Sequence, residues 1–290
     1  MTSRTLLTPA IKAWESYLRD KGSSPYTIKA FNSDVRLLTK FFPPDKSIGA
    51  VTTNDLNRFF EWMEKERNVP CSPKTLARRI TSVKSFYRWL AQYGVLTLDP
   101  AEKVVQHSVI SPLPQVLTEK EFNEVIAAAD RHRRAEVQDA RPFTLVYLLL
   151  ITGIKKSECL GIHMKHVDPD ASNGPQIFIR YPSPANRYKE RKLSMTEDWL
   201  PPYREYLKQY QPTDRLFPWS PRNLEYVLED IGNEAGLSKH LSFDMCRWTC
   251  ALRDYRSGLE PEKIRVKLGI SKIQWREIGL KLKQLSERTK

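Results

Sequence analysis

The side chains best suited to chemistry in this sequence of 290 residues are cations clustered in its second half. Lys155 and Lys156 follow Gly153, and a helix that begins there would suit contact with an anion. The same two residues can instead be lysines that face solvent. Arg247 stands three residues after Asp244, so it can bind a phosphate or form a structural ion pair with Asp244 or Glu158. We expect Glu158 to orient a cation rather than to transfer protons.

The sequence shows no pattern typical of a metal-binding or cofactor-binding site. Cys246 and Cys250 are four residues apart and can share a helix face, but two ligands without a suitably spaced histidine do not make a zinc site. With Cys71 and Cys159 they are predicted to be reduced core thiols. The patterns G-x-x-x-x-G-K-[ST], G-x-G-x-x-G and H-E-x-x-H do not occur. The sequence therefore predicts neither a metal nor a cofactor.

The charge of the chain points to a polyanionic partner. The formal net charge is +13, and nucleic acid is the commonest partner of so basic a protein. Residues 1–110 hold 17 Lys+Arg and 10 Asp+Glu, a net +7, and the remainder holds 30 and 24, a net +6. Both halves are therefore expected to contact nucleic acid.

The first hundred residues have the apolar spacing of helices. Ser24 is predicted to cap the second helix, and Ser72-Pro73 opens the fourth in the preferred order of cap and then proline. Between Arg67 and Leu98 there are six basic residues and no acidic one. The fourth helix is thus predicted to contact DNA, although a solvated basic face would look the same. The side chains concerned are Lys74, Arg78, Arg79, Lys84 and Arg88.

The second half is predicted to be mixed. Thr118 and Glu121 form a capping box at the start of a helix. Residues 176–181 alternate like a strand, and 192–195 can be the partner strand of a hairpin. Further helices are expected at about 119–131, 140–152, 197–210, 220–235, 243–257, 260–268 and 271–287. The predicted fold class is mainly α with a small antiparallel β-sheet.

Prolines mark the expected domain boundary. Residues 108–115 contain Pro112 and Pro114 without periodicity, which predicts an extended linker between domains at 1–107 and 116–290. No apolar run is long enough to span a membrane, and residues 1–10 lack the apolar core of a signal peptide. We expect a cytoplasmic protein, associated with the nucleoid if the source is prokaryotic.

The residues from Thr152 to Ile162, with His166-Val167-Asp168 after them, resemble the first conserved box of tyrosine recombinases, the phage integrase superfamily. Lys189-Glu190-Arg191 resembles the β-hairpin motif of that family, and the segments 72–90, 99–101, 235–237, 244–250 and 268–269 follow its other motifs in order. The resemblance implies a two-domain clamp on duplex DNA. A helical core-binding (SAM-like) domain would precede a mixed α/β domain of the catalytic type.

The chemistry implied by this resemblance is transesterification. In the family a tyrosine attacks a DNA phosphodiester, two arginines stabilise the phosphate charge, a hairpin lysine protonates the leaving hydroxyl, and two further groups assist. Most of these positions differ here. The corresponding residues are Lys155, Asn186 with Arg187 or Lys189 near enough to contact phosphate, Asp244, Arg247, Ile270 and, at the tyrosine position, Gly279.

No tyrosine follows Tyr255, and neither Tyr255 nor Ser271 nor Ser286 is a convincing replacement for the nucleophile. Loss of one charge-stabilising donor commonly costs about 10²–10³ in rate, and loss of the nucleophile removes the covalent route. The sequence therefore predicts a catalytically inactive, DNA-binding regulator, repressor or accessory factor of a phage or mobile element.

Two alternatives remain open: a divergent site-specific recombinase that uses an atypical nucleophile or a partner subunit, and a protein-interaction subunit that does not bind DNA. The C-terminal helix is expected to mediate homo-oligomer formation or to touch the DNA backbone. Besides the five residues of the fourth helix, the predicted DNA contacts are Lys155, Lys156, Arg187, Lys189, Arg191 and Arg247.

Overall fold

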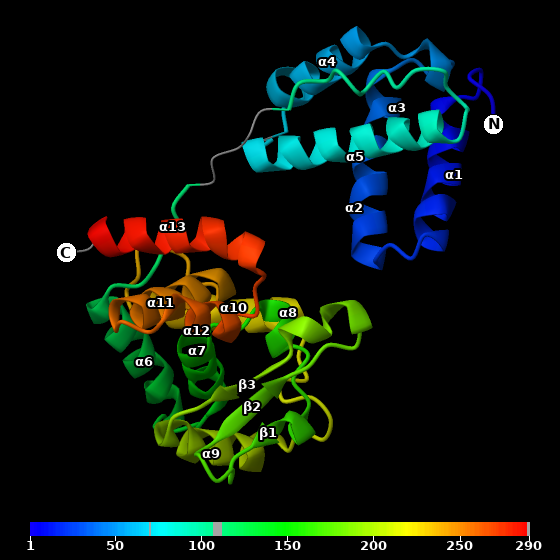
Figure 1. Cartoon of the computed structure of the whole chain (residues 1–290). Helices are drawn as coiled ribbons and strands as arrows, with labels where there is room; N and C mark the ends of the chain where they lie inside the picture. Colours follow the sequence, from blue (N-terminus) through cyan, green and yellow to red (C-terminus); the bar gives the residue numbers. More distant parts are fainter. Residues whose placement is uncertain (70, 107–111, 289–290) are drawn as a thin grey trace. The chain divides into compact units, whose positions relative to one another are not determined.

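The structure, a computed structural model, describes residues 1–69, 71–106 and 112–288. The chain divides into two compact units, Met1–Pro112 and Leu113–Lys290 (Figure 1). Part of the linker predicted at residues 108–115 lies outside the described residues. Within the described ranges, no helix has the length and apolar character needed to cross a membrane.

The first unit contains only helices among its described residues. Two predicted caps are confirmed: the hydroxyl of Ser24 accepts a hydrogen bond from the Thr27 N–H (3.1 Å), and that of Ser72 from the Thr75 N–H (3.2 Å). Helix α2 packs against both α1 and α5, and Trp14 lies fully buried among them. The helices are α1 (Leu7–Asp20), α2 (Pro25–Val35), α3 (Leu38–Phe41), α4 (Thr53–Glu61), a π-helix (Trp62–Glu66) and α5 (Pro73–Gln92).

The second unit is built around one buried helix, α7. Nine of its twelve residues are buried, so it is apolar on all sides, as expected of a central helix. Helices α6, α9, α10 and α11 pack against it. The helices are α6 (Glu119–Arg133), α7 (Arg141–Thr152), α8 (Lys156–Cys159), α9 (Leu200–Tyr210), α10 (Pro221–Glu234), α11 (Phe243–Arg256), α12 (Pro261–Lys267) and α13 (Lys272–Arg288).

A small antiparallel sheet flanks this bundle. Its strands are β1 (Val167–Asp168), β2 (Gln176–Ile179) and β3 (Arg191–Ser194), in that order. The predicted hairpin pairs with Ile177 opposite Leu193, so that both side chains face the core. Strand β1 was not predicted, because two residues are too few to show alternation. The predicted fold class, mainly α with a small antiparallel sheet, is confirmed.

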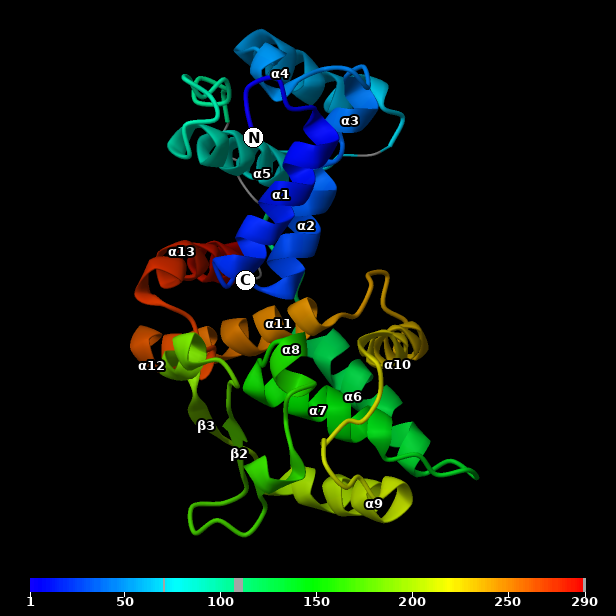
Figure 2. The ribbon, with the colours of Figure 1, turned by 90° about the vertical axis from the view of Figure 1, so that its right-hand side faces the viewer.

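The C-terminal helix α13 packs on α11 and α12 of its own chain. It lies along α11 in both views (Figures 1 and 2). Leu282 and Leu285 are buried in a small core with Leu252, Ile264 and Leu268. All four cysteines are free. Cys159, Cys246 and Cys250 are buried, as predicted for core thiols, whereas the same prediction is wrong for Cys71, which is only partly buried.

Candidate functional site

The site begins where α7 ends. Gly153 takes a left-handed conformation (φ 61°), and its N–H donates to the Leu149 carbonyl, which closes the helix. The chain then turns into α8 with Lys155 at the turn. The Lys155 N–H donates to Oε2 of Glu158 at 2.9 Å. A glycine that permits the turn and a carboxylate that binds the next backbone amide therefore fix the position of Lys155.

Glu158 is buried and carries a dense set of hydrogen bonds. Its two carboxylate oxygens accept from Nη1 and Nη2 of Arg191, each at 3.0 Å, and the hydroxyl of Tyr181 also donates to it. Burial would raise the pKa of Glu158, but the hydrogen bonds and charge of Arg191, together with Tyr181, hold that pKa below its usual value. The carboxylate thus stays ionised and orients Arg191.

Arg191, one of the predicted DNA contacts, is occupied within the protein. Besides Glu158, its guanidinium donates to the carbonyls of Lys267 (2.6 Å) and Lys189 (3.1 Å). A Cβ added at Gly269 would lie 2.5 Å from Nη1. The guanidinium therefore packs against Gly269, where a larger residue would clash with it, and it stabilises the site through its hydrogen bonds to Glu158 and the Lys267 carbonyl.

Arg247 comes from α11 and ties two loops together. Its Nη1 donates to the Gly153 carbonyl and its Nη2 to the Leu268 carbonyl (2.7 Å). Among the described residues it forms no ion pair with Asp244 or Glu158, so of the two proposed roles the structural bridge to a carboxylate is not observed. Burial, followed by the charge of Arg191, lowers the pKa of Arg247, whereas Glu158 acts in the opposite direction.

Lys155 and Arg247 line the same cavity, of about 440 Å³, between α8, α10 and α11. Figure 2 shows these three helices next to one another. Sequence analysis did not single out Arg222 and His240, which also line the cavity. Arg222 lies outside the recognised motifs, and His240 falls between two of them. The carboxylates at the cavity are Glu225, Glu229 and Asp244.

The two lysines that open α8 differ in their surroundings. Lys156 is paired with Glu225, whose carboxylate lies 2.7 Å from its Nζ. Lys155 is half-buried and, among the described residues, ion-paired with no carboxylate. Burial lowers the pKa of Lys155, and the positive charges of Arg247, Lys189 and Arg191 lower it further, although Glu158 opposes them.

The hairpin between β2 and β3 supplies Lys189 beside this cluster. Residues 184–189 form a 3-10 helix in which Lys189 Nζ donates to Asn186 Oδ1 at 2.8 Å. The same ammonium lies 5.0 Å from the ring centroid of Tyr188 and 5.9 Å from that of Tyr181. Arg187 is exposed on the loop. Lys155, Lys189, Arg191 and Arg247 thus form a cation cluster with Glu158 as its anion.

Two of the remaining family positions lie on or near α13. Ile270 is buried in the small core beneath that helix. A Cβ added at Gly279 would meet only Trp275, at 3.5 Å or more, which is ordinary van der Waals contact. Position 279 therefore has room for a larger side chain.

Of the side chains on α5 that were predicted to contact DNA, some are bound to other groups of the protein. Arg78 and Arg79 both approach the buried carboxylate of Asp34, Arg78 in a hydrogen-bonded ion pair and Arg79 with Nε at 3.9 Å. Lys84 donates to the Glu102 carbonyl. Lys74 and Arg88 are exposed. Arg78 and Arg79 therefore help to hold α5 against α2, a role that a charge count along one helix does not show.

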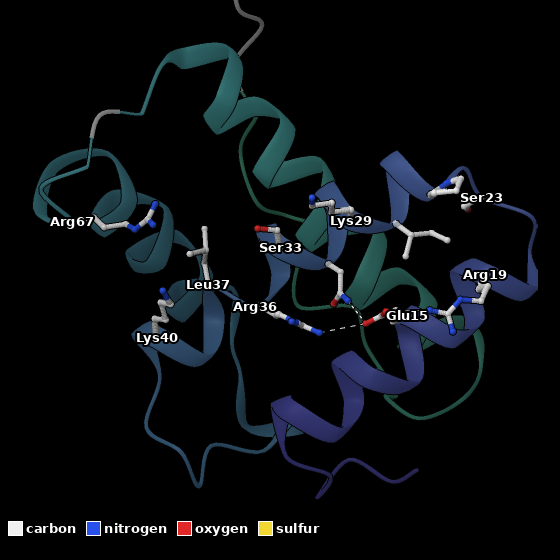
Figure 3. Close-up of a pocket in the computed structure, with 12 residues that line it drawn as sticks. Glu15, Arg19, Ser23, Lys29, Ser33, Arg36, Leu37, Lys40 and Arg67 are labelled. Atoms are coloured by element: carbon white, nitrogen blue, oxygen red, sulfur yellow. Dashed lines mark hydrogen bonds and ion pairs between the residues drawn. The ribbon is translucent and has the colours of Figure 1, made fainter. Parts of the chain in front are cut away.

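A second cationic surface in the first unit was missed. Figure 3 shows this groove, of about 900 Å³, with Arg36 reaching toward Glu15 (3.4 Å). Its cations come from distant parts of the chain, so no local charge run marks it; they are Arg19, Lys29, Arg36, Lys40 and Arg67. No group of three or more potential metal ligands occurs among the residues with described positions.

A helical unit followed by a mainly helical unit with a small sheet is the arrangement of the tyrosine recombinase fold. Residues 11–94 match the phage integrase N-terminal SAM-like domain, and residues 115–277 match the phage integrase family. The latter covers more than half of the chain. The chain therefore belongs to the phage integrase family.

Relatives and solved structures agree. The chain is 23% identical over 265 residues to tyrosine recombinase XerC of Anoxybacillus flavithermus, covering 86% of this chain and 85% of that protein. It is 26% identical to XerC of Corynebacterium efficiens, with coverage of 89% and 81%. XerH recombinase bound to a palindromic difH substrate shares the fold with a TM-score of 0.73 at 17% identity, covering 94% of this chain and 83% of that one.

These findings correct the prediction of function. A catalytically inactive DNA-binding regulator was predicted, and that prediction is wrong: the full-length relatives are named tyrosine recombinases, and the family to which the chain belongs consists of enzymes. The error arose because missing side chains at individual positions were taken as loss of the whole activity. The alternative of a divergent recombinase agrees better with the relatives.

Proposed function

We propose that this protein is a divergent site-specific recombinase that cleaves and rejoins duplex DNA, with the scissile phosphate bound in the cavity between α8, α10 and α11. The observation that carries the proposal is the meeting of Lys155 and Arg247 at that cavity, with Arg191 and Glu158 behind them. Within the described ranges, Lys155 and Arg247 form no ion pair with the carboxylates that also line the cavity, Glu225, Glu229 and Asp244. Two such cations favour an anionic ligand, and positioned cations stabilise the charge of a phosphoryl transition state.

Electrostatics supports a phosphodiester as that ligand. Lys155 is disfavoured in its charged form by burial and by the neighbouring cations. A bound phosphate would relieve this repulsion, and the net charge of +13 would draw DNA to both units. Because the substrate is DNA, we place the activity in the cytoplasm.

The nucleophile must then come from a position other than Gly279. Tyr181 is a poor candidate, because burial and its hydrogen bond to Glu158 raise its pKa. Tyr188 on the hairpin (69% exposed) and Tyr226 beside Arg222 (47% exposed) have accessible rings. A subunit in an oligomer is the other source. We propose that α13 contributes to such an oligomer through its exposed Ile273 and Leu280.

The test is covalent trapping. Duplexes recovered by genomic footprinting are synthesised with a nick, so that the cleaved strand end diffuses away, and incubated with the purified chain. We expect a protein–DNA adduct that resists denaturation, and mass spectrometry identifies the attached residue. Tyr188→Phe and Tyr226→Phe show whether either residue is that nucleophile.

A mixing experiment tests supply of the nucleophile by another subunit. One subunit is the wild-type chain, and the other carries Gly279→Tyr together with Arg247→Met, so that it has a tyrosine but an impaired phosphate site. An adduct on the second subunit that requires the first shows attack between subunits. If neither the wild-type chain nor the mixture forms any adduct or recombinant product on DNA that it binds, the proposed activity is wrong.

A further inference from the structure

We propose that Lys155 is the general acid of the cleavage step and gives a proton to the bridging oxygen that leaves the phosphorus. This inference rests on the proposed function, but it concerns which side chain transfers the proton and does not depend on the identity of the nucleophile. It assigns to Lys155 a task different from the phosphate contact expected at this position.

The first argument is availability. Four cationic side chains form the cluster, and three of them have hydrogen-bonding partners within the protein. Arg191 is bound by the carboxylate of Glu158 and two carbonyls, and Arg247 by two carbonyls. Lys189 donates to Asn186 and lies against two aromatic rings. Among the described residues, Lys155 is the member of this cluster whose side chain forms no hydrogen bond, ion pair or ring contact.

The second argument is position. Lys155 lines the cavity together with Arg247, so a phosphate held there by the guanidinium would lie beside the ammonium. The Lys155 backbone is fixed by the left-handed Gly153 and by the 2.9 Å hydrogen bond to Glu158. The side chain is therefore delivered to the cavity from a rigid turn, which suits a group that must meet one particular oxygen.

The third argument is acidity. Arginine remains protonated under all ordinary conditions and is a poor proton donor. Lysine can release a proton when its charged form is destabilised, and the pKa of Lys155 is lowered by burial, Arg247, Lys189 and Arg191, with Glu158 opposing. The family position that carries a lysine on the hairpin is near Asn186, an amide that cannot act as an acid.

Two protons move in each direction: the nucleophile gives its hydroxyl proton to water on cleavage and recovers one from water on rejoining, and Lys155 transfers the proton of the leaving oxygen. In cleavage, the nucleophile bonds to phosphorus, the bond from phosphorus to the leaving oxygen breaks, and its electron pair takes a proton from the Lys155 ammonium. The products are a free DNA hydroxyl and a neutral amine. In rejoining, that amine takes the proton back as the hydroxyl attacks the phosphorus, so one residue serves both steps.

The experiment replaces the leaving oxygen by sulfur. A thiol has a pKa of about 8.5, far below the value of about 15.7 for water, so a thiolate leaves without a proton. Nicked duplexes with sulfur at the 5′ or the 3′ bridging position are compared with the all-oxygen duplex, and adduct formation is timed. The variants are Lys155→Met, Lys155→Arg, Arg247→Lys and, as a control outside the cavity, Lys208→Met on the exposed side of α9.

We expect Lys155→Met and Lys155→Arg to slow cleavage of the oxygen duplex by about 10²–10⁴-fold, the usual contribution of a general acid. With sulfur at the leaving position both should approach the wild-type rate, which also shows that they fold and bind. Lys155→Arg is the decisive variant, because arginine keeps the positive charge but does not release its proton. Arg247→Lys should stay slow on both duplexes, and Lys208→Met should cleave both normally.

Equal impairment of the Lys155 variants on oxygen and sulfur duplexes that they bind would overturn the assignment and leave Lys155 as a phosphate contact. If sulfur at the leaving position rescues a Lys189→Met variant but not the Lys155 variants, the general acid is Lys189 on the hairpin. If the wild-type chain cleaves neither duplex, the proposed function itself is wrong. If the wild-type chain cleaves but sulfur does not rescue the Lys155 variants, only the assignment of Lys155 as the general acid is wrong.

Discussion

Glu158→Gln is the substitution that most directly tests how the site is held together. The carboxylate is 4% exposed and accepts two hydrogen bonds from Arg191 at 3.0 Å. Glutamine keeps the volume but leaves the buried guanidinium without a counter-ion. Breaking a buried ion pair from one side costs about 3–5 kcal/mol. Because glutamine can still accept one hydrogen bond, we expect a loss near the lower end, about 3 kcal/mol.

The assay is hydrogen exchange in increasing urea, followed in peptides of β3, α8 and α12, because unfolding of a chain with two units need not be a single transition. Glu225→Gln is the matched control. Its partner Lys156 is 2.7 Å away, closer than Arg191 is to Glu158, but both side chains are partly exposed (33% and 44%). An exposed pair contributes little because solvent screens it, so this variant should remain close to the wild type.

The same residue predicts an acid limit to stability. The folded pKa of Glu158 is lowered relative to the unfolded chain. Its contribution is therefore fully present above the unfolded pKa and is lost as the pH falls through the folded value. Protection of β3 in the wild type should decrease over that range, and Glu158→Gln should show a weaker dependence.

A double variant, Glu158→Gln with Arg191→Met, removes both charges and should recover part of the loss, because the penalty comes from the unpaired cation. A single-variant loss below about 1 kcal/mol, or a double variant whose loss is the plain sum of the two single losses, would refute the view that Glu158 and Arg191 act as one unit.

Two further predictions concern other parts of the chain. Gly279→Ala should stabilise α13 by about 0.5–1 kcal/mol, because alanine favours helix and its Cβ meets nothing closer than 3.5 Å. Gly232→Ala should instead destabilise the fold around α10, because its Cβ would lie 2.8 Å from that of Leu241. Urea denaturation of the two variants checks both signs. Lys74→Glu and Arg88→Glu should each weaken duplex binding and reduce the slope of log affinity against log salt by about 0.9, measured by fluorescence anisotropy, and an unchanged slope would remove α5 from the DNA contacts.

The sequence determined the local structure well, since local structure depends on neighbouring residues. Ser24 and Ser72 cap the helices that they were predicted to cap, and the alternation at residues 176–181 gave the hairpin. It also determined that residue 279 is a glycine and that the chain is strongly basic. It could not determine what the glycine means for activity, because activity depends on groups that other elements or other subunits bring to the phosphate.

Which cations are available was decided only by the tertiary structure. Arg191 looked like a DNA contact until its partner Glu158, 33 residues away, was located, and Arg78 is held by Asp34, 44 residues away. Lys155 and Lys156 were both predicted to contact DNA, yet of the two only Lys156 has a carboxylate in contact. A charge is neutralised by what packs against it, and packing joins residues that are distant along the chain, so composition fixed the number of cations and the fold fixed which of them can meet a substrate.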